Sequence, residues 1–413
     1  MSNTRTPVID LPPFDYLDPR FHGPARYQVL AELRDTDPGL ALDQFGRVNV
    51  LRYHDVRNAY SDHERFRNVE TGWVASMGCT SGPLFDWQSH ALIMANPPRH
   101  TAMRHAVRQI NLRLARRMAP EIRRRAHDLV DMFPTDGTVD VARTFAFALP
   151  VQVIMGLLHL PEEDEDLIAE LSPHTLPAGP HTIDRANEAN RQFRLYVEQR
   201  IEERRAAPLD DDILTDIIAT ADAGQLNSDE LWATVQTLIL AGHETSSSAL
   251  TTGIYQLLRD PAQWAALKAD RSLLPNAAEE ILRYEAAVDA MARILVVDTE
   301  ISGVMLPAGT LISPSIASAN RDPQVFSDPD RFDIHRDNAR MQLSFGAGIH
   351  RCTGAPLAQV EIPAAIDVLL DRLEHVELAE EPRYSTGLFR GFDALHLSAK
   401  TVPRSADEAL PSA

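Results

Sequence analysis

The chain has 413 residues, of which 44% are hydrophobic and 24% charged. These proportions exclude a disordered, collagen-like or coiled-coil protein. Lys and Arg total 40 against 59 for Asp and Glu, and the formal net charge of −19 disfavours nucleic acid or an anionic membrane as the partner of the whole surface. The two cysteines, Cys79 and Cys352, can build neither a disulfide framework nor a four-thiolate metal site, so we expect a reducing cytoplasm.

The first 16 residues lack the unbroken apolar stretch of a signal peptide or membrane anchor, and we expect an extended N-terminal segment there. A helical period then runs from Tyr27 to Leu33. Two short alternating runs, 40–42 and 48–50, flank a turn at 43–46 and predict a β-hairpin.

Helical patterns dominate from Pro97 to about Leu373. The uncharged stretch 144–161 is split by Pro150, which favours a buried core helix over a membrane span. Asn227 and Glu230 have the spacing of a capping box, and Asp260-Pro261 ends a pattern that predicts one long helix over Ser228–Arg259.

Strand-like segments return at 294–297, 311–313 and 394–397, and no linker divides the middle of the chain. We therefore expect a mainly α-helical protein with small β-sheets. It forms a single large domain over residues 17–402, followed by a flexible tail at 403–413.

One cysteine lies among closely spaced glycines, in the run Phe345-Gly346-Ala347-Gly348-Ile349-His350-Arg351-Cys352-Thr353-Gly354. Glycines let the backbone pass close to a bulky group, and the following helical pattern places Cys352 at a helix N-terminus, where amide N–H groups favour a thiolate. An isolated cysteine is more often an inert buried side chain. The surrounding glycines favour the other interpretation, a loop whose backbone is already shaped to present the Cys352 thiolate to a metal.

This run matches every specified position of the Phe-Gly-x-Gly-x-His-x-Cys-x-Gly loop, so the chain resembles the bacterial cytochrome P-450 haem-thiolate monooxygenases. The resemblance implies the family's prism-shaped fold and a heme b cofactor, iron protoporphyrin IX, with Cys352 as the axial iron ligand. It also implies that Phe345, Gly346 and Gly354 contact the haem, and it leaves Cys79 as a structural residue.

The middle of the long helix carries Ala241-Gly242-His243-Glu244-Thr245. A mid-helix Gly and a Thr that can bond back to a carbonyl predict a local distortion with room for a small diatomic ligand. The run resembles the family's Ala-Gly-x-(Asp/Glu)-Thr oxygen-activation motif, which implies that Ala241 and Gly242 lie at the haem. It also implies that Thr245 and Glu244 guide protons. The alternative is an ordinary helix kink, in which the Thr hydroxyl bonds within the helix and the Glu side chain lies in solvent.

Four cationic side chains resemble the family's propionate-binding positions, and each taken alone is more often a surface charge or a core histidine. They are His100, Arg104, Arg293 and His350. His100 and Arg104 are four residues apart and share one helix face.

Glu280 and Arg283 are three residues apart, and Arg331 follows in a turn-rich stretch. The ordinary interpretation of such a pair is a weak surface contact. Here it resembles the family's Glu-x-x-Arg motif with a second arginine, which implies a buried structural network behind the cysteine loop.

Nine arginines and one acid, Glu121, lie between Arg99 and Arg125. A charge run is usually a solvated helix face. The resemblance instead implies docking of an acidic ferredoxin near this region, with a ferredoxin reductase as the source of electrons. Arg108, Arg113 and Arg116 are the residues chosen to test it.

By resemblance, the substrate pocket draws on segments 69–93, 177–183, 287–291 and 388–390, together with the long helix near Ala241. We expect an apolar organic substrate of natural-product, terpenoid or aromatic type, because the side chains from these segments are Trp73, Met77, Leu84, Phe85, Trp87, Val288, Met291, Leu388 and Phe389. Asp289, His243 and Arg390 add either a polar substrate contact or a structural one.

The expected reaction is insertion of one oxygen atom from O₂ into an unactivated C–H bond. The alternatives are peroxide use, oxidative coupling without oxygen insertion and, from a different class, a non-catalytic haem sensor or carrier. Glu244 together with Thr245 favours O₂ activation over peroxide.

Overall fold

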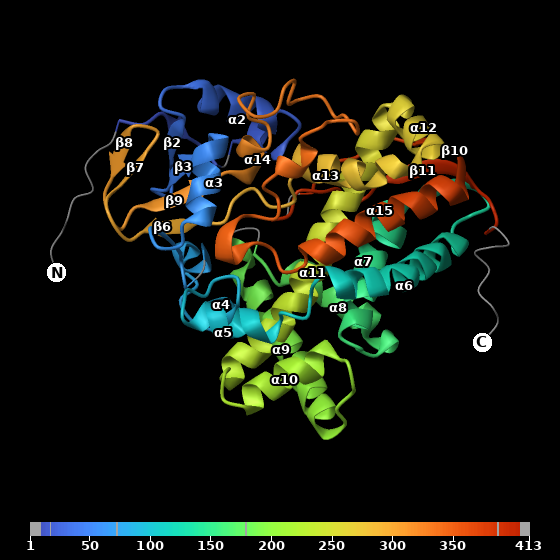
Figure 1. Cartoon of the computed structure of the whole chain (residues 1–413), viewed down its shortest axis with the longest axis horizontal. Coiled ribbons are helices and arrows are strands. Elements are labelled where there is room, and N and C mark those ends of the chain that lie inside the picture. Colours follow the sequence, from blue (N-terminus) through green and yellow to red (C-terminus); the bar gives the residue numbers. More distant parts are fainter. Residues whose placement is uncertain (1–9, 17, 72, 178–179, 386–387, 405–413) are drawn as a thin grey trace.

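The computed structural model describes residues 10–16, 18–71, 73–177, 180–385 and 388–404 (Figure 1). Within the described residues the molecule is mainly helical, and its strands are short. Most strands gather at one end of the molecule, whereas β10 and β11 lie at the opposite end (Figure 1). The fold class predicted from the sequence is confirmed. Most of the predicted N-terminal segment and tail lies outside the described residues.

Helices form most of the molecule. They are α1 (Pro19–His22), α2 (Arg26–Asp35), α3 (Tyr53–Ser61), α4 (Pro83–His90), α5 (Arg99–Ala106), α6 (Leu112–Asp131), α7 (Ala148–Leu157), α8 (Glu165–Leu171), α9 (Ile183–Ala206), α10 (Ile213–Asp222), α11 (Ser228–Arg259), α12 (Pro261–Ala269), α13 (Leu274–Tyr284), α14 (Ile316–Ala319) and α15 (Ala355–Arg372). A π-helical segment, η2 (Ala142–Phe147), leads into α7, and a short 3-10 turn, η8 (Gly348–His350), lies in the cysteine loop.

The strands form three small sheets. They are β1 (Pro13–Phe14), β2 (Leu40–Asp43), β3 (Val48–Val50), β4 (Phe66–Asn68), β5 (Asp136–Asp140), β6 (Arg293–Leu295), β7 (Thr299–Ile301), β8 (Val304–Leu306), β9 (Leu311–Pro314), β10 (Leu373–Leu378) and β11 (His396–Thr401). The largest sheet has the order β1-β2-β3-β9-β6-β4, and β2 pairs antiparallel with β3 with Leu40 opposite Val50. The predicted hairpin is therefore confirmed, whereas the predicted strand at 394–397 begins later, at His396.

Helix α11 runs through the centre of the molecule (Figure 1). Its 32 residues rise about 48 Å along the axis. It begins where the Asn227 side chain accepts from the Glu230 amide and the Glu230 side chain accepts from the Asn227 amide, and it ends before Asp260. Both predicted boundaries are confirmed, because the capping box and the following Asp-Pro are local signals.

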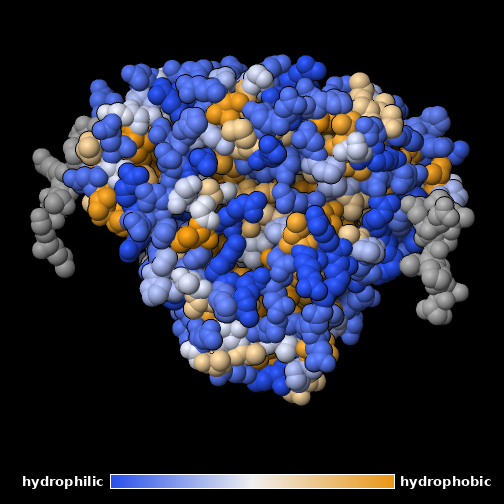
Figure 2. Space-filling view, in the orientation of Figure 1, coloured by the Kyte–Doolittle hydropathy of each residue, from blue (hydrophilic) through white to orange (hydrophobic). Residues whose placement is uncertain are grey.

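The uncharged stretch at 144–161 packs in the interior as predicted. In α7 the side chains of Leu149, Val151, Val153 and Met155 are at most 2% exposed. No helix among the described residues has the length and apolarity needed to cross a membrane. Hydrophilic residues predominate on the face shown in Figure 2, with hydrophobic residues scattered among them.

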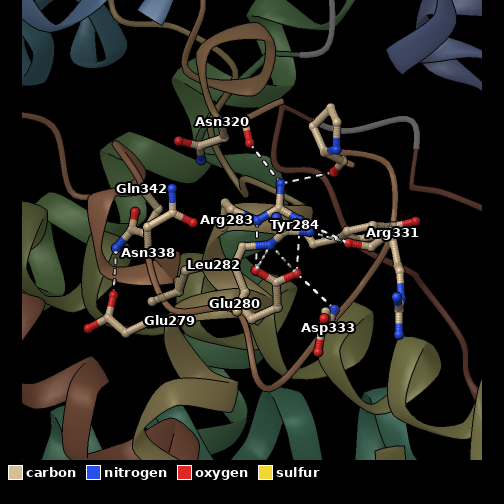
Figure 3. A network of polar contacts seen from close by, with 12 residues as sticks. Glu279, Glu280, Leu282, Arg283, Tyr284, Asn320, Arg331, Asp333, Asn338 and Gln342 are labelled. Carbon is tan, nitrogen blue, oxygen red and sulfur yellow. Dashed lines mark hydrogen bonds and ion pairs between the residues drawn. The ribbon is translucent and has the colours of Figure 1, made fainter. Parts of the chain in front are cut away.

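A buried ionic network centred on Glu280 fastens α13 to the segment that follows α14 (Figure 3). Arg283 Nε lies 2.6 Å from Glu280 Oε2, and both side chains are 0% exposed. Arg283 also donates to the backbone carbonyls of Asn320 and Pro329. Losing one partner of a fully buried ion pair leaves an uncompensated charge, so this network holds the fold behind the cysteine loop.

The second arginine of the network is Arg336, and the prediction of Arg331 was wrong. Arg336 Nε lies 3.1 Å from Glu280 Oε2, and its side chain is 7% exposed. Arg331 is exposed, and its side chain points away from Glu280 (Figure 3). Arg331 contributes only its backbone carbonyl, which accepts from Arg283 and Arg336.

Candidate functional site

The cysteine loop is shaped by two glycines with left-handed backbone conformation. Gly346 has φ +64° and Gly348 has φ +67°. A Cβ on Gly348 would lie 2.7 Å from the carbonyl oxygen of Tyr60, closer than atoms pack, so only glycine fits. The Cys352 amide donates to the Phe345 carbonyl at 2.8 Å and closes the loop.

Cys352 lies just before the N-terminus of α15. The backbone amides of Gly354 and Ala355 donate to its sulfur, as the glycine-rich pattern predicts. Burial nevertheless raises the pKa of the Cys352 thiol, and these amides with Arg104 and Arg351 oppose the rise only in part. The thiolate therefore needs a further positive charge to be favoured, and a bound metal ion supplies one.

Cys352 and Ala241 are both exposed, although α11 crosses the centre of the molecule (Figure 1) and burial dominates the titration of the thiol. Both residues are therefore accessible to a bound group. A haem group fits this location, because it needs a soft thiolate ligand and small residues on the facing helix.

A cluster of cationic groups lies beside the loop. The rings of His100 and His350 lie in contact, tilted by 59° to each other, with centroids 4.2 Å apart. Arg104 from α5 donates to the hydroxyl of Thr353. Arg293 is 4% exposed, packs over the ring of Tyr60 with its guanidinium carbon 4.9 Å from the centroid, and donates to the carbonyls of Met291 and Ala292.

This cluster lacks an acidic partner among the described residues. Burial and the neighbouring cations Arg104 and His63 lower the pKa of His100 to about 4. Burial, His100, Arg293, His63 and Arg104 lower the pKa of His350 to about 3. Burial also lowers the pKa of Arg293. The low pKa values leave both rings neutral near pH 7, whereas Arg104 and Arg293 carry charge with no acid beside them among the described residues. A buried charge without an anion is costly unless a ligand brings negative charge, and the two carboxylates of haem meet that need, with the neutral rings as further N–H donors.

Two asparagines that the sequence analysis missed support the cluster. The side-chain nitrogen of Asn68 lies 3.2 Å from His350 Nε2, and Asn68 and Asn96 bond each other through side chain and backbone. His63 was also missed, although it acts on both histidines of the cluster. No sequence pattern indicates these residues, because they come from a short strand and from loops.

The oxygen-activation run lies in the middle of α11. Thr245 Oγ1 donates to the Ala241 carbonyl at 3.1 Å, and Glu244 is partly exposed. The helix stays α-helical through this turn, so the predicted distortion is absent. A Cβ on Gly242 would lie 2.8 Å from Ile154 Cδ1, and this glycine therefore allows α7 to pack closely against α11.

The predicted pocket residues fall into three groups. Asp289 and Arg390 have structural partners, since Asp289 lies 2.8 Å from Arg26 and Arg390 lies 2.9 Å from Glu285. Leu84 and Trp87 are buried in the core, and Trp87 donates to Thr237 of α11 at 3.1 Å. The remaining side chains are partly buried or exposed, namely Met77, Phe85, Val288, Met291, Leu388 and Phe389, and the side chain of Trp73 lies outside the described residues.

A separate cavity of about 520 Å³ opens between α6, α7 and α8. None of the predicted site residues lines it. Two of its acids are already paired, Glu121 with Arg125 and Asp211 with Arg117. This cavity is therefore separate from the cysteine loop.

Comparison with known proteins identifies the family and the fold. The family described as Cytochrome P450 matches residues 46–387. The chain is 34% identical to 6-deoxyerythronolide B hydroxylase of Saccharopolyspora erythraea, over 85% of this chain and 89% of that protein. It is 36% identical to vitamin D(3) 25-hydroxylase of Pseudonocardia autotrophica, over 92% of this chain and 94% of that protein. A solved structure, the cytochrome P450 enzyme CxnD for C–S bond formation in chuangxinmycin biosynthesis, superposes with a TM-score of 0.86 at 32% identity, covering 96% of this chain and 99% of that one.

Proposed function

The chain belongs to the cytochrome P450 family of haem-iron oxidoreductases, and we propose that it is a ferredoxin-dependent monooxygenase acting on an apolar organic molecule. The proposal places three features of the described residues at one inner surface. These are an accessible cysteine at a helix N-terminus, a set of cations without acids, and an acid–alcohol pair on the long helix.

The cofactor proposed for this surface is heme b. Cys352 ligates the iron, and Arg104, Arg293, His100 and His350 bind the propionates, the two arginines through their charge and the two neutral rings as hydrogen-bond donors. Phe345, Gly346, Gly354, Ala241 and Gly242 line the group. When bound, haem iron uses O₂, two electrons and two protons to place one oxygen atom in a substrate and release the other as water.

Thr245 and Glu244 have the roles of proton carriers. The Thr245 hydroxyl donates to the Ala241 carbonyl, which leaves the lone pairs of its oxygen free to accept a proton or a hydrogen bond. Glu244 is 20% exposed and can exchange protons with water. Thr245→Ala should retain haem and substrate but divert electrons from product to hydrogen peroxide. Peroxide formation equal to that of the unmodified enzyme would exclude this role.

An acidic ferredoxin is the proposed electron donor, with its reductase as partner. Several arginines between Arg99 and Arg125 are paired internally, since Arg117 binds Asp211, Arg123 binds Asp367 and Arg124 binds Glu121. Three others are exposed and make no ion pair within the described part of the chain, namely Arg108, Arg113 and Arg116. They lie on or beside α6, which packs along α15, the helix that follows Cys352.

Reversal of these three charges tests the docking surface. Arg108→Glu, Arg113→Glu and Arg116→Glu together should slow reduction by ferredoxin and flatten its dependence on ionic strength. A charge-matched control reverses three exposed cations elsewhere, Arg57, Arg143 and Lys400. Equal reduction rates in the two triple variants would exclude this surface.

The proposed substrate is an apolar natural product, terpenoid or aromatic molecule. The predicted lining is apolar, and the two relatives are named for hydroxylation of 6-deoxyerythronolide B and vitamin D(3). Cys79 and Cys352 are both unpaired, in keeping with a reducing cytoplasm. A panel of such compounds tests the class, because a true substrate displaces water from ferric iron and shifts the Soret band to shorter wavelength.

Oxidative coupling is the second candidate reaction. One observation favours it, the superposition on CxnD, which is described as an enzyme for C–S bond formation. Product analysis under ¹⁸O₂ separates the two reactions. Monooxygenation incorporates one labelled atom into the product, whereas coupling incorporates none.

A further inference from the structure

His243 and Glu244 are neighbours on α11, next to Thr245. His243 is 0% exposed, and its ring packs edge-on against Phe147 of η2 with centroids 5.4 Å apart. Its Nδ1 lies 2.7 Å from the carbonyl oxygen of Ile239, one turn earlier in the helix. Its Nε2 is buried without a hydrogen-bond partner and lies 3.6 Å from Glu244 Oε1.

These contacts fix the tautomer of His243. A backbone carbonyl can only accept, so Nδ1 carries a proton and donates it to Ile239. In the neutral ring Nε2 is then a bare acceptor facing a carboxylate oxygen, which is also an acceptor. That arrangement becomes favourable when one proton lies between the two atoms.

The two elements that contact His243 and Gly242, η2 and α7, offer no competing partner. Helix α7 carries no ionisable side chain, and η2 carries only Arg143, which is exposed. On α15 the nearest titratable group that contacts this part of α11 is Glu361, which is bonded to Ser246. Within the described residues, His243 Nε2 is the only basic nitrogen within ion-pair distance of Glu244.

We propose that His243 and Glu244 share one proton and that His243 is a positioning residue for the acid that supplies protons in the proposed reaction. The proton moves from Nε2 to Glu244 Oε1, so that an N–H bond breaks as an O–H bond forms and both side chains end neutral. Glu244 then releases that proton toward Thr245 and is reprotonated from water through its exposed edge. The inference rests on the proposed function and adds to it a buried proton store beside Thr245.

Nuclear magnetic resonance of the histidine side chains tests the pair directly. The ¹⁵N-histidine-labelled enzyme is measured in its diamagnetic ferrous carbon monoxide form, and the His243 signals are identified by their loss in His243→Gln. We expect the tautomer with a proton on Nδ1 and a Nε2 signal that moves with pH as the shared proton leaves. In Glu244→Gln the amide donates to a neutral Nε2, so that movement should disappear.

Two magnetic resonance results would overturn the proposal. One is a His243 ring protonated on Nε2 alone, and the other is the same pH response in the unmodified enzyme and in Glu244→Gln. The control is His396→Gln, which removes a surface histidine that lies 2.8 Å from Glu380 and is 37% exposed. It should leave the His243 signals unchanged.

The second measurement is the fraction of electrons that end in hydrogen peroxide instead of product. In His243→Gln and His243→Phe the fraction of electrons lost to peroxide should match the unmodified enzyme near pH 6 and exceed it increasingly as the pH rises, because the stored proton is gone. His396→Gln should follow the unmodified enzyme throughout. An unchanged peroxide profile in both His243 variants would overturn the proposal. If no substrate is turned over, the proposed function fails. The magnetic resonance experiment then still decides whether His243 and Glu244 share a proton.

Discussion

Glu361 is a buried carboxyl group on α15 whose titration should be visible in the stability of the protein. It is 1% exposed, it is bonded to Ser246 of α11, and its Oε1 has no partner. Burial raises the pKa of Glu361 to about 8. The folded protein therefore holds this carboxyl protonated at neutral pH.

The sign of the effect follows from proton linkage. Between the unfolded pKa near 4.5 and the folded pKa near 8, the folded state binds the proton and the unfolded state does not. Stability from this group is therefore complete below pH 4.5 and is lost as the pH rises toward 8. At about 1.4 kcal/mol per pH unit, the loss amounts to roughly 5 kcal/mol.

Glu361→Gln removes the titration and keeps the shape of the side chain. Urea unfolding of the haem-loaded protein at about pH 5 and pH 8.5, followed by circular dichroism, gives the two free energies of unfolding. The unmodified protein should lose several kcal/mol more than the variant between the two pH values. Glu377→Gln on exposed β10 serves as the control and should behave like the unmodified protein. Equal pH dependence in Glu361→Gln and the unmodified protein would refute the reasoning.

Three other predictions concern the fold around the site. Glu280→Ala should destabilise the protein by about 3–5 kcal/mol and reduce haem content, because it leaves Arg283 and Arg336 buried without an anion; normal haem content would contradict the burial. Arg336→Leu should lower the urea midpoint strongly and Arg331→Leu should barely change it, and the reverse order would contradict the assignment of the second arginine. Gly348→Ala should cost more stability than Gly309→Ala, because both glycines have positive φ but only Gly348 faces a backbone oxygen at 2.7 Å; equal unfolding midpoints would contradict this packing.

Local signals account for the parts of the fold that the sequence predicted well. The boundaries of α11 depend on the Asn227–Glu230 box and on Asp260-Pro261, which act within one helical turn. The hairpin depends on a turn in which Gly46 has φ +75° and Asp43 accepts from two backbone amides. The shape of the cysteine loop likewise depends on glycines within the loop itself, Gly346 and Gly348.

Contacts between distant segments account for what sequence reasoning missed. Arg331 and Arg336 lie in the same turn-rich stretch, and no periodicity decides which of them turns inward to Glu280. The acids that pair with the basic run, such as Asp211 and Asp367, are far away in sequence. The direction of Gly242 toward Ile154 also depends on where α7 packs, which only the fold determines.

Thiolate ligation of haem by Cys352 is the central claim, and the absorption spectrum of the reduced protein under carbon monoxide tests it most directly. The account predicts a Soret band strongly shifted to the red in the unmodified protein and in Cys79→Ser, since Cys79 is buried away from the loop. Cys352→Ser should lose that band. An imidazole-type band in the unmodified protein, the absence of haem, or a red-shifted band that survives Cys352→Ser would contradict the account.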